Sequence, residues 1–223
     1  MGNSLLSILV LAGIAIFLIL RLRSVLGTRE GFEKPRVDQP GEPMPEPHRA
    51  RQNFEVIDGG VDHDINDNVK PDSPAAENMA AIKRVDPSFS VADFLNGARG
   101  AYEMILMAFE HDDLDSIKPF LSEEVFEAFS GVVASRQAEG LSIDSQFVGL
   151  REIEIVSADL DRATDEAEIT VRFLGETSSV VRNSAGEVVE GDPNVINRHK
   201  DIWTFARRVG SDDPNWLLVA TGD

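Results

Sequence analysis

The fold of this 223-residue chain is decided by the stretch Ser90–Phe109, which reads SVADFLNGARGAYEMILMAF. Ser90 is a good helix N-cap with Asp93 three residues on, and Phe89 and Phe94 occupy the two positions of a hydrophobic staple. Apolar residues then recur at helical spacing, namely Val91, Phe94, Leu95, Ala98, Tyr102, Ile105 and Phe109. The stretch therefore predicts one helix whose broad apolar face is buried against a second element.

Two further helices are predicted after this one. A short helix is expected over Leu114–Leu121, and another begins at Ser122, where two glutamates suit the positive end of its dipole, and stops near Gly140. Gly97 and Gly100 lie inside the first helix at a cost of up to about 1 kcal/mol each relative to Ala. They predict that another element packs close to the helix backbone.

Beyond Gly140 the apolar residues alternate with polar ones, which is the period of half-buried strands. A hairpin turn is predicted at Asn183–Gly186 and a break at Asp192-Pro193. The predicted strands cover residues 147–160, 167–174, 198–209 and 216–220. Helices first and antiparallel strands afterwards indicate an α+β domain, in which helices cover one face of a curved antiparallel sheet.

The start of the chain predicts a membrane anchor. The run Ser4–Leu20 is uncharged and almost wholly apolar, and Arg21 and Arg23 follow it at once. About 17 to 25 such residues cross a bilayer as one helix. A secretory signal peptide is disfavoured, because no cation precedes the run and no small-residue cleavage site follows it. Residues 1–23 are therefore predicted to be a transmembrane helix, with a buried core helix as the alternative.

Basic residues after the apolar run set the predicted topology. Cytoplasmic flanks collect Lys and Arg, so the N-terminus is expected outside and the body of the chain on the cytoplasmic side of the cell inner (plasma) membrane. Arg21, Arg23, Arg29 and Lys34 lie where anionic lipid head groups attract a cation by about 1 kcal/mol. Contact with anionic lipid and a purely topological role are both compatible with this pattern.

Residues 24–87 are predicted to be a linker, first basic and then acidic, rich in proline and disordered, which holds the domain 88–223 off the membrane. The acidic run that begins at Asp62 resembles a calcium-binding loop. Counted from Asp62, however, the sixth position is Asp67 where glycine is needed, and the twelfth is Ser73 where glutamate is needed. A solvated acidic linker is favoured over a calcium site.

Composition narrows the function classes. The chain carries 39 acidic and 21 basic residues, a formal net charge of -18, and such a surface repels nucleic acid. It contains no cysteine, so disulfides, thiolate nucleophiles and thiolate metal sites are excluded. Its four histidines are scattered, two in the predicted linker, one after the first helix and one on a strand. No catalytic constellation, metal site or cofactor is predicted.

Four segments resemble a known family. They are Leu22–Pro35, Phe94–Phe109, Asp201–Arg207 and the run Asp213-Pro-Asn-Trp216. Together, in this order and spacing, they are similar to the bacterial, alphaproteobacterial-type relatives of subunit 44 of the mitochondrial inner-membrane translocase. The resemblance covers the domain, and also the anchor and its exit for the bacterial branch.

The resemblance implies both a fold and a role. The implied fold is a cone-like α+β domain of the nuclear transport factor two superfamily. The implied role is a scaffold at the inner face of a membrane, where the mitochondrial member tethers a heat-shock-70 chaperone to the import channel and a related branch anchors the ribosome. The mitochondrial protein's long charged N-terminal region has no counterpart in this sequence, which puts the specific motor partners in doubt.

A concave pocket between helices and sheet is also implied by the resemblance. Its candidate lining residues are Tyr102, Ile105, Phe109, Phe173, Trp203, Phe205 and Trp216. The predicted function is a membrane-anchored adaptor that binds translocase, chaperone or ribosomal proteins. The alternatives are lipid or small-molecule binding in the pocket and, less favoured, an enzyme. Asp201, on a strand beside aromatic residues, is predicted to form a buried ion pair with Arg172 or Arg207.

Overall fold

The computed structural model describes residues 62–222, which form an antiparallel sheet and the helices that pack against it. The strands are β1 (Ser142–Asp161), β2 (Glu166–Arg182), β3 (Val188–Gly191), β4 (Asn197–Arg208) and β5 (Leu217–Gly222). They lie in the order β1-β2-β4-β5, and β3 pairs with β2 beyond the start of β4. The prediction of an α+β fold is confirmed.

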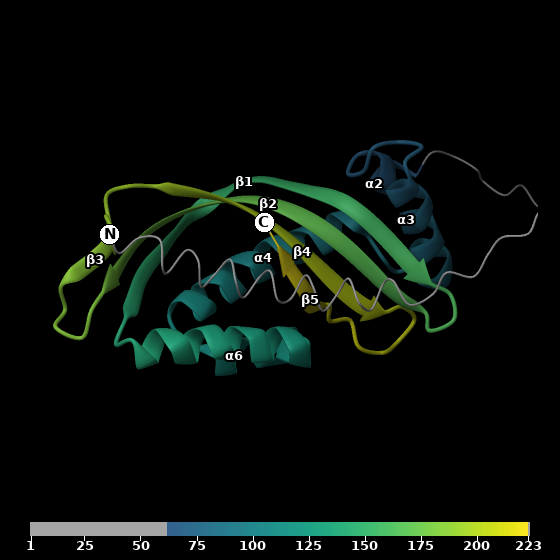
Figure 1. Cartoon of the computed structure of the whole chain (residues 1–223). Helices are drawn as coiled ribbons and strands as arrows, with labels where there is room; N and C mark the ends of the chain where they lie inside the picture. Colours follow the sequence, from purple (N-terminus) through teal and green to yellow (C-terminus); the bar gives the residue numbers. More distant parts are fainter. Residues whose placement is uncertain (1–61, 223) are drawn as a thin grey trace, which may run out of the picture.

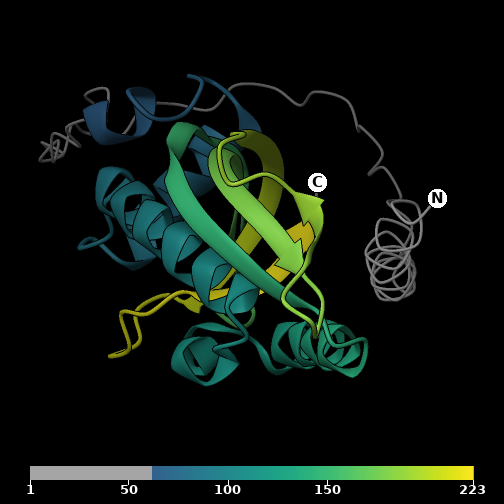
Figure 2. The ribbon, with the colours of Figure 1, turned by 90° about the vertical axis from the view of Figure 1, so that its left-hand side faces the viewer.

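The helices occupy the inside of the sheet's curve and its two ends. They are α2 (His63–Asn66), α3 (Pro74–Val85), α4 (Val91–Glu110), α5 (Leu114–Ile117), the 3-10 turn η1 (Lys118–Phe120) and α6 (Glu123–Ala138). Strands β1 and β2 arch over α4, with α6 beneath one end of the arch and α2 and α3 at the other (Figure 1). The view turned by 90° shows α4 against one face of the sheet (Figure 2).

Helix α4 forms as the sequence predicts. The hydroxyl of Ser90 accepts a hydrogen bond from the backbone N–H of Asp93 at 3.2 Å, which caps the first turn. Its glycines, however, do not mark a close approach, since a Cβ added at Gly97 or Gly100 would meet nothing within 4 Å. The prediction of tight packing there is corrected: both glycines face open space.

The last part of the predicted linker is folded. Ser73 caps α3, and Pro74 lies in the first turn of the helix, where proline is well tolerated. Met79 and Ile82 of this helix are fully buried in the domain core. The linker prediction is corrected for residues 62–87, because the proline and serine that indicated a linker here start a helix. The alanine-rich apolar face of α3 is too weak a signal to reveal it.

The sheet is curved by irregularities in β1. Its pairing with β2 shifts register at three places, between Phe147 and Gly149, between Leu150 and Glu152, and between Ile155 and Ser157. Such bulges bend a strand and increase its twist. The predicted turn between β2 and β3 is confirmed, with Gly186 at φ +80° in the left-handed region.

The core lies between α4 and the concave face of the sheet. Along β2 every second residue faces α4, and Ala167, Ile169, Val171 and Phe173 are each fully buried. Tyr102 and Ile105 of α4 meet them from the helix side, with 0% and 1% of their surface exposed. The concave face is therefore filled by side chains along most of its length.

The predicted anchor, its flanking cations Arg21, Arg23, Arg29 and Lys34, and the linker up to residue 61 lie outside the described residues. Among the helices of residues 62–222, none has the length and apolar character needed to cross a bilayer.

Candidate functional site

A pocket of about 280 Å³ lies at the α3 end of the molecule. It is formed by the first turns of α4, the end of β4 and the segment that leads into β5. Its aromatic walls are Phe89, Phe94, Phe205 and Trp216. The rings of Phe94 and Trp216 meet edge to face with centroids 4.9 Å apart, and Phe94 meets Phe205 in the same way at 6.0 Å. These contacts form an aromatic wall, and Ser88, Ser90, Asp93 and Arg207 supply polar atoms to the rest of the lining.

One wall of the pocket carries a nearly buried ion pair. The guanidinium of Arg207 lies 5.1 Å from the centroid of the Trp216 ring and donates to the carboxylate of Asp86 at 2.5 Å. The two charged side chains are only 13% and 14% exposed. Hydrogen bonds from the hydroxyl and the backbone N–H of Ser88, together with Arg207, hold the pKa of Asp86 below its usual value. The ion pair holds the loop between α3 and α4 against β4.

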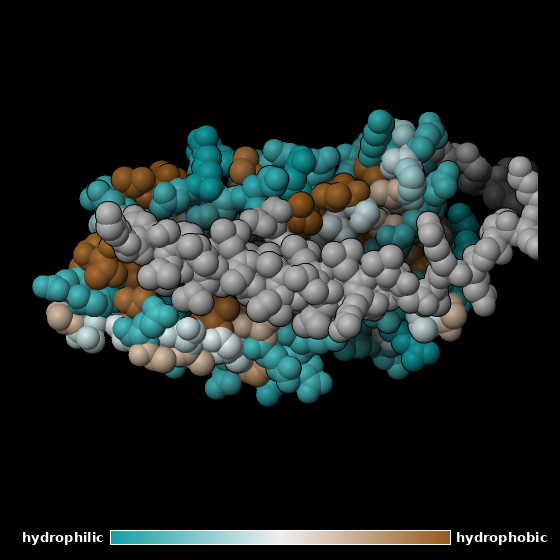
Figure 3. Space-filling model, in the orientation of Figure 1, coloured by the Kyte–Doolittle hydropathy of each residue, from teal (hydrophilic) through white to brown (hydrophobic). Residues whose placement is uncertain are grey.

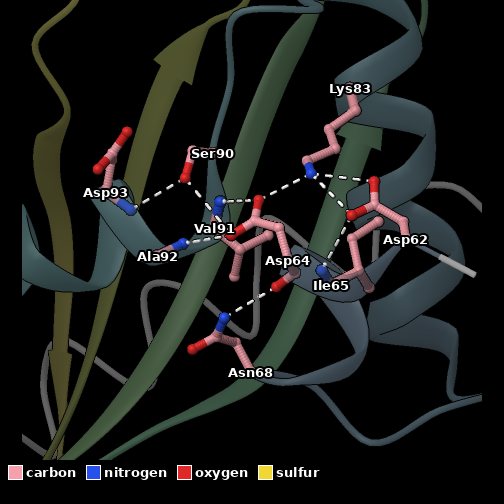
Figure 4. Close-up of polar contacts among 9 residues, drawn as sticks. All are labelled: Asp62, Asp64, Ile65, Asn68, Lys83, Ser90, Val91, Ala92 and Asp93. Carbon is pink, nitrogen blue, oxygen red and sulfur yellow. Dashed lines mark hydrogen bonds and ion pairs between the residues drawn. The ribbon is translucent and has the colours of Figure 1, made fainter.

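A second cluster of charges fixes the start of α4 behind the pocket (Figure 4). The carboxylate of Asp64 accepts hydrogen bonds from the backbone N–H groups of Val91 at 2.8 Å and Ala92 at 2.9 Å. Lys83 of α3 contacts the same carboxylate at 2.7 Å and that of Asp62 at 2.9 Å. Residues of α2 thus cap a helix that begins more than twenty positions later in the chain.

These contacts shift the pKa values of Asp64 and Lys83 in the second cluster. Burial by itself raises the pKa of Asp64, but the hydrogen bonds from Lys83 and from the α4 backbone outweigh it and lower the pKa. For Lys83, burial lowers the pKa, and the contacts with Asp64 and Asp62 more than reverse that effect. Both groups therefore stay charged at neutral pH, and the cluster ties α2, α3 and α4 together.

Only two of the candidate pocket residues line this pocket, Phe205 and Trp216. Tyr102, Ile105, Phe173 and Trp203 are instead buried in the core, and Phe109 packs on Phe129 of α6 with ring centroids 4.6 Å apart. The curved sheet closes so tightly on α4 that Tyr102 stacks flat on Phe173 at 4.5 Å. The concave face is packed where a pocket is predicted, and the cavity lies at its end.

Asp201 is not placed beside either of the two arginines predicted as its partner. It accepts a hydrogen bond from the hydroxyl of Tyr102 at 2.6 Å, which joins α4 to β4. Asp201 lies opposite Phe173 in the sheet and so shares the core face, whereas Arg172 points to the other face and contacts Glu152 and Glu154. The other candidate, Arg207, pairs with Asp86. Strand alternation is the physical reason for this correction.

The Tyr102 hydroxyl is held in the core as a proton donor. Burial is the main cause that raises its pKa, and the negative charge of Asp201 raises it further. The hydroxyl lies directly on the backbone of Gly175, where an added Cβ would be 2.4 Å from its oxygen. Only glycine therefore allows Tyr102 to reach Asp201. The arrangement joins α4, β2 and β4 in the core.

The polar groups near the pocket do not form a reactive set. Ser90 caps α4, Arg207 is paired with Asp86, and Asp93 lies at the rim. Two histidines lie elsewhere, His111 at 3.0 Å from the carbonyl of Ser145 and His199 at 2.7 Å from the hydroxyl of Thr177. Residues 62–222 contain no group of three or more side chains that could hold a metal ion. The pocket is suited to holding an apolar group.

Of the charged residues of this site, the sequence pointed only to Arg207, as one half of a buried ion pair with a different partner. Asp62 and Asp64 carry the composition of a solvated linker, and Asp86 and Arg207 are 121 positions apart. No local signal connects these residues, because each contact joins segments that are distant in the sequence.

Comparison with known proteins gives one family. The model described as "Tim44-like domain" matches residues 75–223, which includes α3. The chain is 24% identical over 178 residues to mitochondrial import inner membrane translocase subunit TIM44-1 of Arabidopsis thaliana, covering 76% of this chain and 37% of that protein. The human subunit TIM44 is 28% identical over 147 residues, with coverages of 65% and 32%. The chain thus spans about a third of the length of these relatives.

Among solved structures, the intermembrane space region of chloroplast protein ARC6 matches 57% of this chain and 94% of that one. The identity is 13% and the TM-score 0.39, a similarity too low to bear on function.

Proposed function

The chain belongs to the Tim44-like domain family, and from this membership we propose that it is a protein-interaction module linked to protein translocation at an inner membrane. In this proposal it has no catalytic activity. The apolar run Ser4–Leu20 anchors it as a single span with the N-terminus outside, and the domain works at the inner face of the membrane. Its partners are translocase, chaperone or ribosomal proteins, since the relatives that it matches are named as translocase subunits.

The observation that carries the proposal is the aromatic pocket at the α3 end. Its volume of about 280 Å³ falls at or below the lower limit of small-molecule sites, roughly 300–1,000 Å³. A pocket of this size accommodates one large apolar side chain of a partner. Buried aromatic anchors of this kind supply most of the binding energy of protein interfaces. Because Asp86 already neutralises Arg207, the pocket does not demand a charged ligand.

Site-specific photocrosslinking in membranes tests the proposal. A photoreactive residue at Pro214, which is exposed and lines the pocket, is expected to capture a protein of translocation, folding or ribosome docking. The same probe at Val156, 50% exposed on β1, is the control. Trp216→Ala is expected to reduce capture at Pro214 while the unfolding transition is retained. Capture of lipid alone from both positions would refute the adaptor role.

Lipid or small-molecule binding in the same pocket is the second candidate. The aromatic rings and the Arg207 side chain line the same pocket, so an amphipathic ligand with an oxygen at one end would find an apolar wall beside a cationic group. Mass spectrometry of the purified full chain separates the candidates. The adaptor is expected to be empty, whereas a stoichiometric lipid or metabolite that is lost in Trp216→Ala would favour the second function.

The cations after the apolar run are proposed to contact anionic lipid, at about 1 kcal/mol per residue near the surface. Replacement of Arg21, Arg23, Arg29 and Lys34 by glutamine is expected to weaken the dependence of vesicle association on anionic lipid. An unchanged dependence would leave them with a topological role only.

A further inference from the structure

Strand β3 and the start of β4 form one edge of the sheet. Strand β3 pairs with β2 on one side, and β5 covers β4 only over Ile202–Ala206. In the part of the chain that the structure describes, no strand pairs with the other side of β3 or of residues 197–201. We call residues 188–201 the β3 edge. Backbone N–H and C=O groups on such an edge can pair with an added strand.

Branched aliphatic side chains are concentrated on the β3 edge. Val188 is 48% exposed, Val189 50%, Val195 50% and Ile196 54%. Hydrophobic residues gather on the surface at the end of the molecule where β3 lies (Figure 3). Exposed β-branched side chains on a strand are stabilised mainly by cross-strand neighbours. The β3 edge thus offers an added strand both backbone pairing and apolar contact.

The opposite edge of the sheet, formed by β1, is less suited to pairing with an added strand. Strand β1 is interrupted by its three register shifts, and Asn78 of α3 donates to the backbone carbonyl of Ala158 at 2.7 Å. Bulges and covering helices are the usual ways in which proteins protect an edge from pairing. The structure therefore favours the β3 edge over the β1 edge for strand addition.

The charges beside β3 select the partner. Glu187, Glu190 and Asp192 are exposed and flank the valines of β3, whereas the cations of the same edge, Arg198 and Lys200, lie beyond the turn at the start of β4. Pairing of β3 with β3 of a second copy would bring like charges together on a molecule that already carries a net charge of -18. We propose that the β3 edge binds an extended segment of a partner protein in which β-branched apolar residues alternate with Lys or Arg. This inference stands apart from the pocket and does not depend on the proposed function.

Hydrogen exchange on the full chain in detergent micelles tests the inference. The probe is a short synthetic peptide of alternating valine and lysine, which is expected to slow backbone amide exchange in residues 188–201. The same peptide N-methylated at alternate amides cannot pair with a strand and is expected to have no effect there. Equal binding of both peptides, or protection confined to residues 142–154 of β1, would overturn the proposal. Self-association that the peptide does not displace would identify a second copy as the occupant and also overturn it.

Two pairs of variants separate strand addition from general attraction to an acidic surface. Glu187→Lys with Glu190→Lys is expected to weaken peptide binding roughly tenfold, because two favourable cross-strand charge pairs become repulsive. Glu127→Lys with Glu139→Lys changes the charge equally on the exposed face of α6 and is the control. Equal losses in both variants would show a nonspecific charge effect and contradict the proposal.

The second pair addresses the apolar contact. Val188→Thr with Val189→Thr keeps the strand propensity and is expected to weaken peptide binding severalfold. The matched control is Val148→Thr with Val156→Thr on β1, where the valines are 49% and 50% exposed. Loss of binding in the control and not in the β3 variant would refute the assignment.

Discussion

The two ends of the sheet differ in how their backbone and charges are covered. At the α3 end, Asn78 caps a carbonyl of β1, and the Asp86–Arg207 pair is nearly buried. At the β3 end, Val188 and Val189 are half exposed, and no strand among residues 62–222 pairs with the outer side of β3. The α3 end therefore packs into the core, whereas the β3 end presents half-exposed side chains and a strand edge at the surface.

The largest expected effect tests whether α3 belongs to the core. Ile82→Ala is expected to lower the free energy of unfolding by about 2–5 kcal/mol, because the side chain is fully buried. Val85→Ala in the same helix is the control, since Val85 is 42% exposed and its loss should change stability by less than about 0.5 kcal/mol. Denaturant unfolding followed by tryptophan fluorescence measures both. If both substitutions changed the free energy of unfolding by the same small amount, α3 would not be part of the folded core.

A smaller effect is expected midway between the ends, at Gly175. Gly175→Ala is expected to destabilise the domain by about 1–3 kcal/mol, because the new Cβ overlaps the Tyr102 hydroxyl. The cost should fall in a Tyr102→Phe background, where that oxygen is absent. Gly100→Ala, with nothing within 4 Å, is the control and is expected to stabilise α4 by about 0.5–1 kcal/mol. A cost independent of Tyr102 would contradict the packing described for this pair.

Acidification is expected to loosen the α3 end first. The folded pKa of Asp64 is lowered, so its stabilising contribution is complete above the unfolded value of about 4 and is lost as pH falls further. Asp64→Ala should cost about 0.5–2 kcal/mol at pH 7, as for a lost helix cap, and progressively less below about pH 4.

Unfolding measured from pH 7 to pH 3 gives this difference. Asn66→Ala, an uncharged position in the same short helix, is the control. A cost for Asp64→Ala that persists unchanged at low pH would mean that its charge does not hold α4.

The smallest effect is expected at the β3 end. Val189→Thr should change the free energy of unfolding by less than about 0.5 kcal/mol, because half of the side chain is already exposed. If Val189→Thr destabilised the domain as much as Ile82→Ala, the two ends would not differ in how much their side chains contribute to stability.

Much of the fold could be predicted because its signals are local. The cap at Ser90, the helical spacing up to Phe109 and the alternation after Gly140 each depend on neighbours within a few positions. The turn between β2 and β3 needs a left-handed backbone at residue 186, and the sequence has glycine there, which adopts this conformation readily. Helix α3 was missed because its apolar side chains are mostly alanines.

The site could be predicted only in part. Phe205 and Trp216 were among the residues named for the pocket that the family resemblance implies, but which aromatic residues fill the core and which border a cavity depends on the curvature of the sheet. Asp201 was predicted beside Arg172 or Arg207, whereas the hydrogen bond that it accepts comes from Tyr102, on a helix 99 positions away.

The sequence alone therefore determined the α+β class, the order of the helices and strands after Ser90 and the resemblance to a family, because local periodicity and short motifs carry these features. Only the tertiary structure decided that Asp64 of α2 caps α4, that side chains fill the concave face, and that no strand among residues 62–222 pairs with the outer side of β3. Each of these depends on contacts between segments that are distant in the sequence, and the curvature that the bulges in β1 give the sheet decides which side chains meet α4.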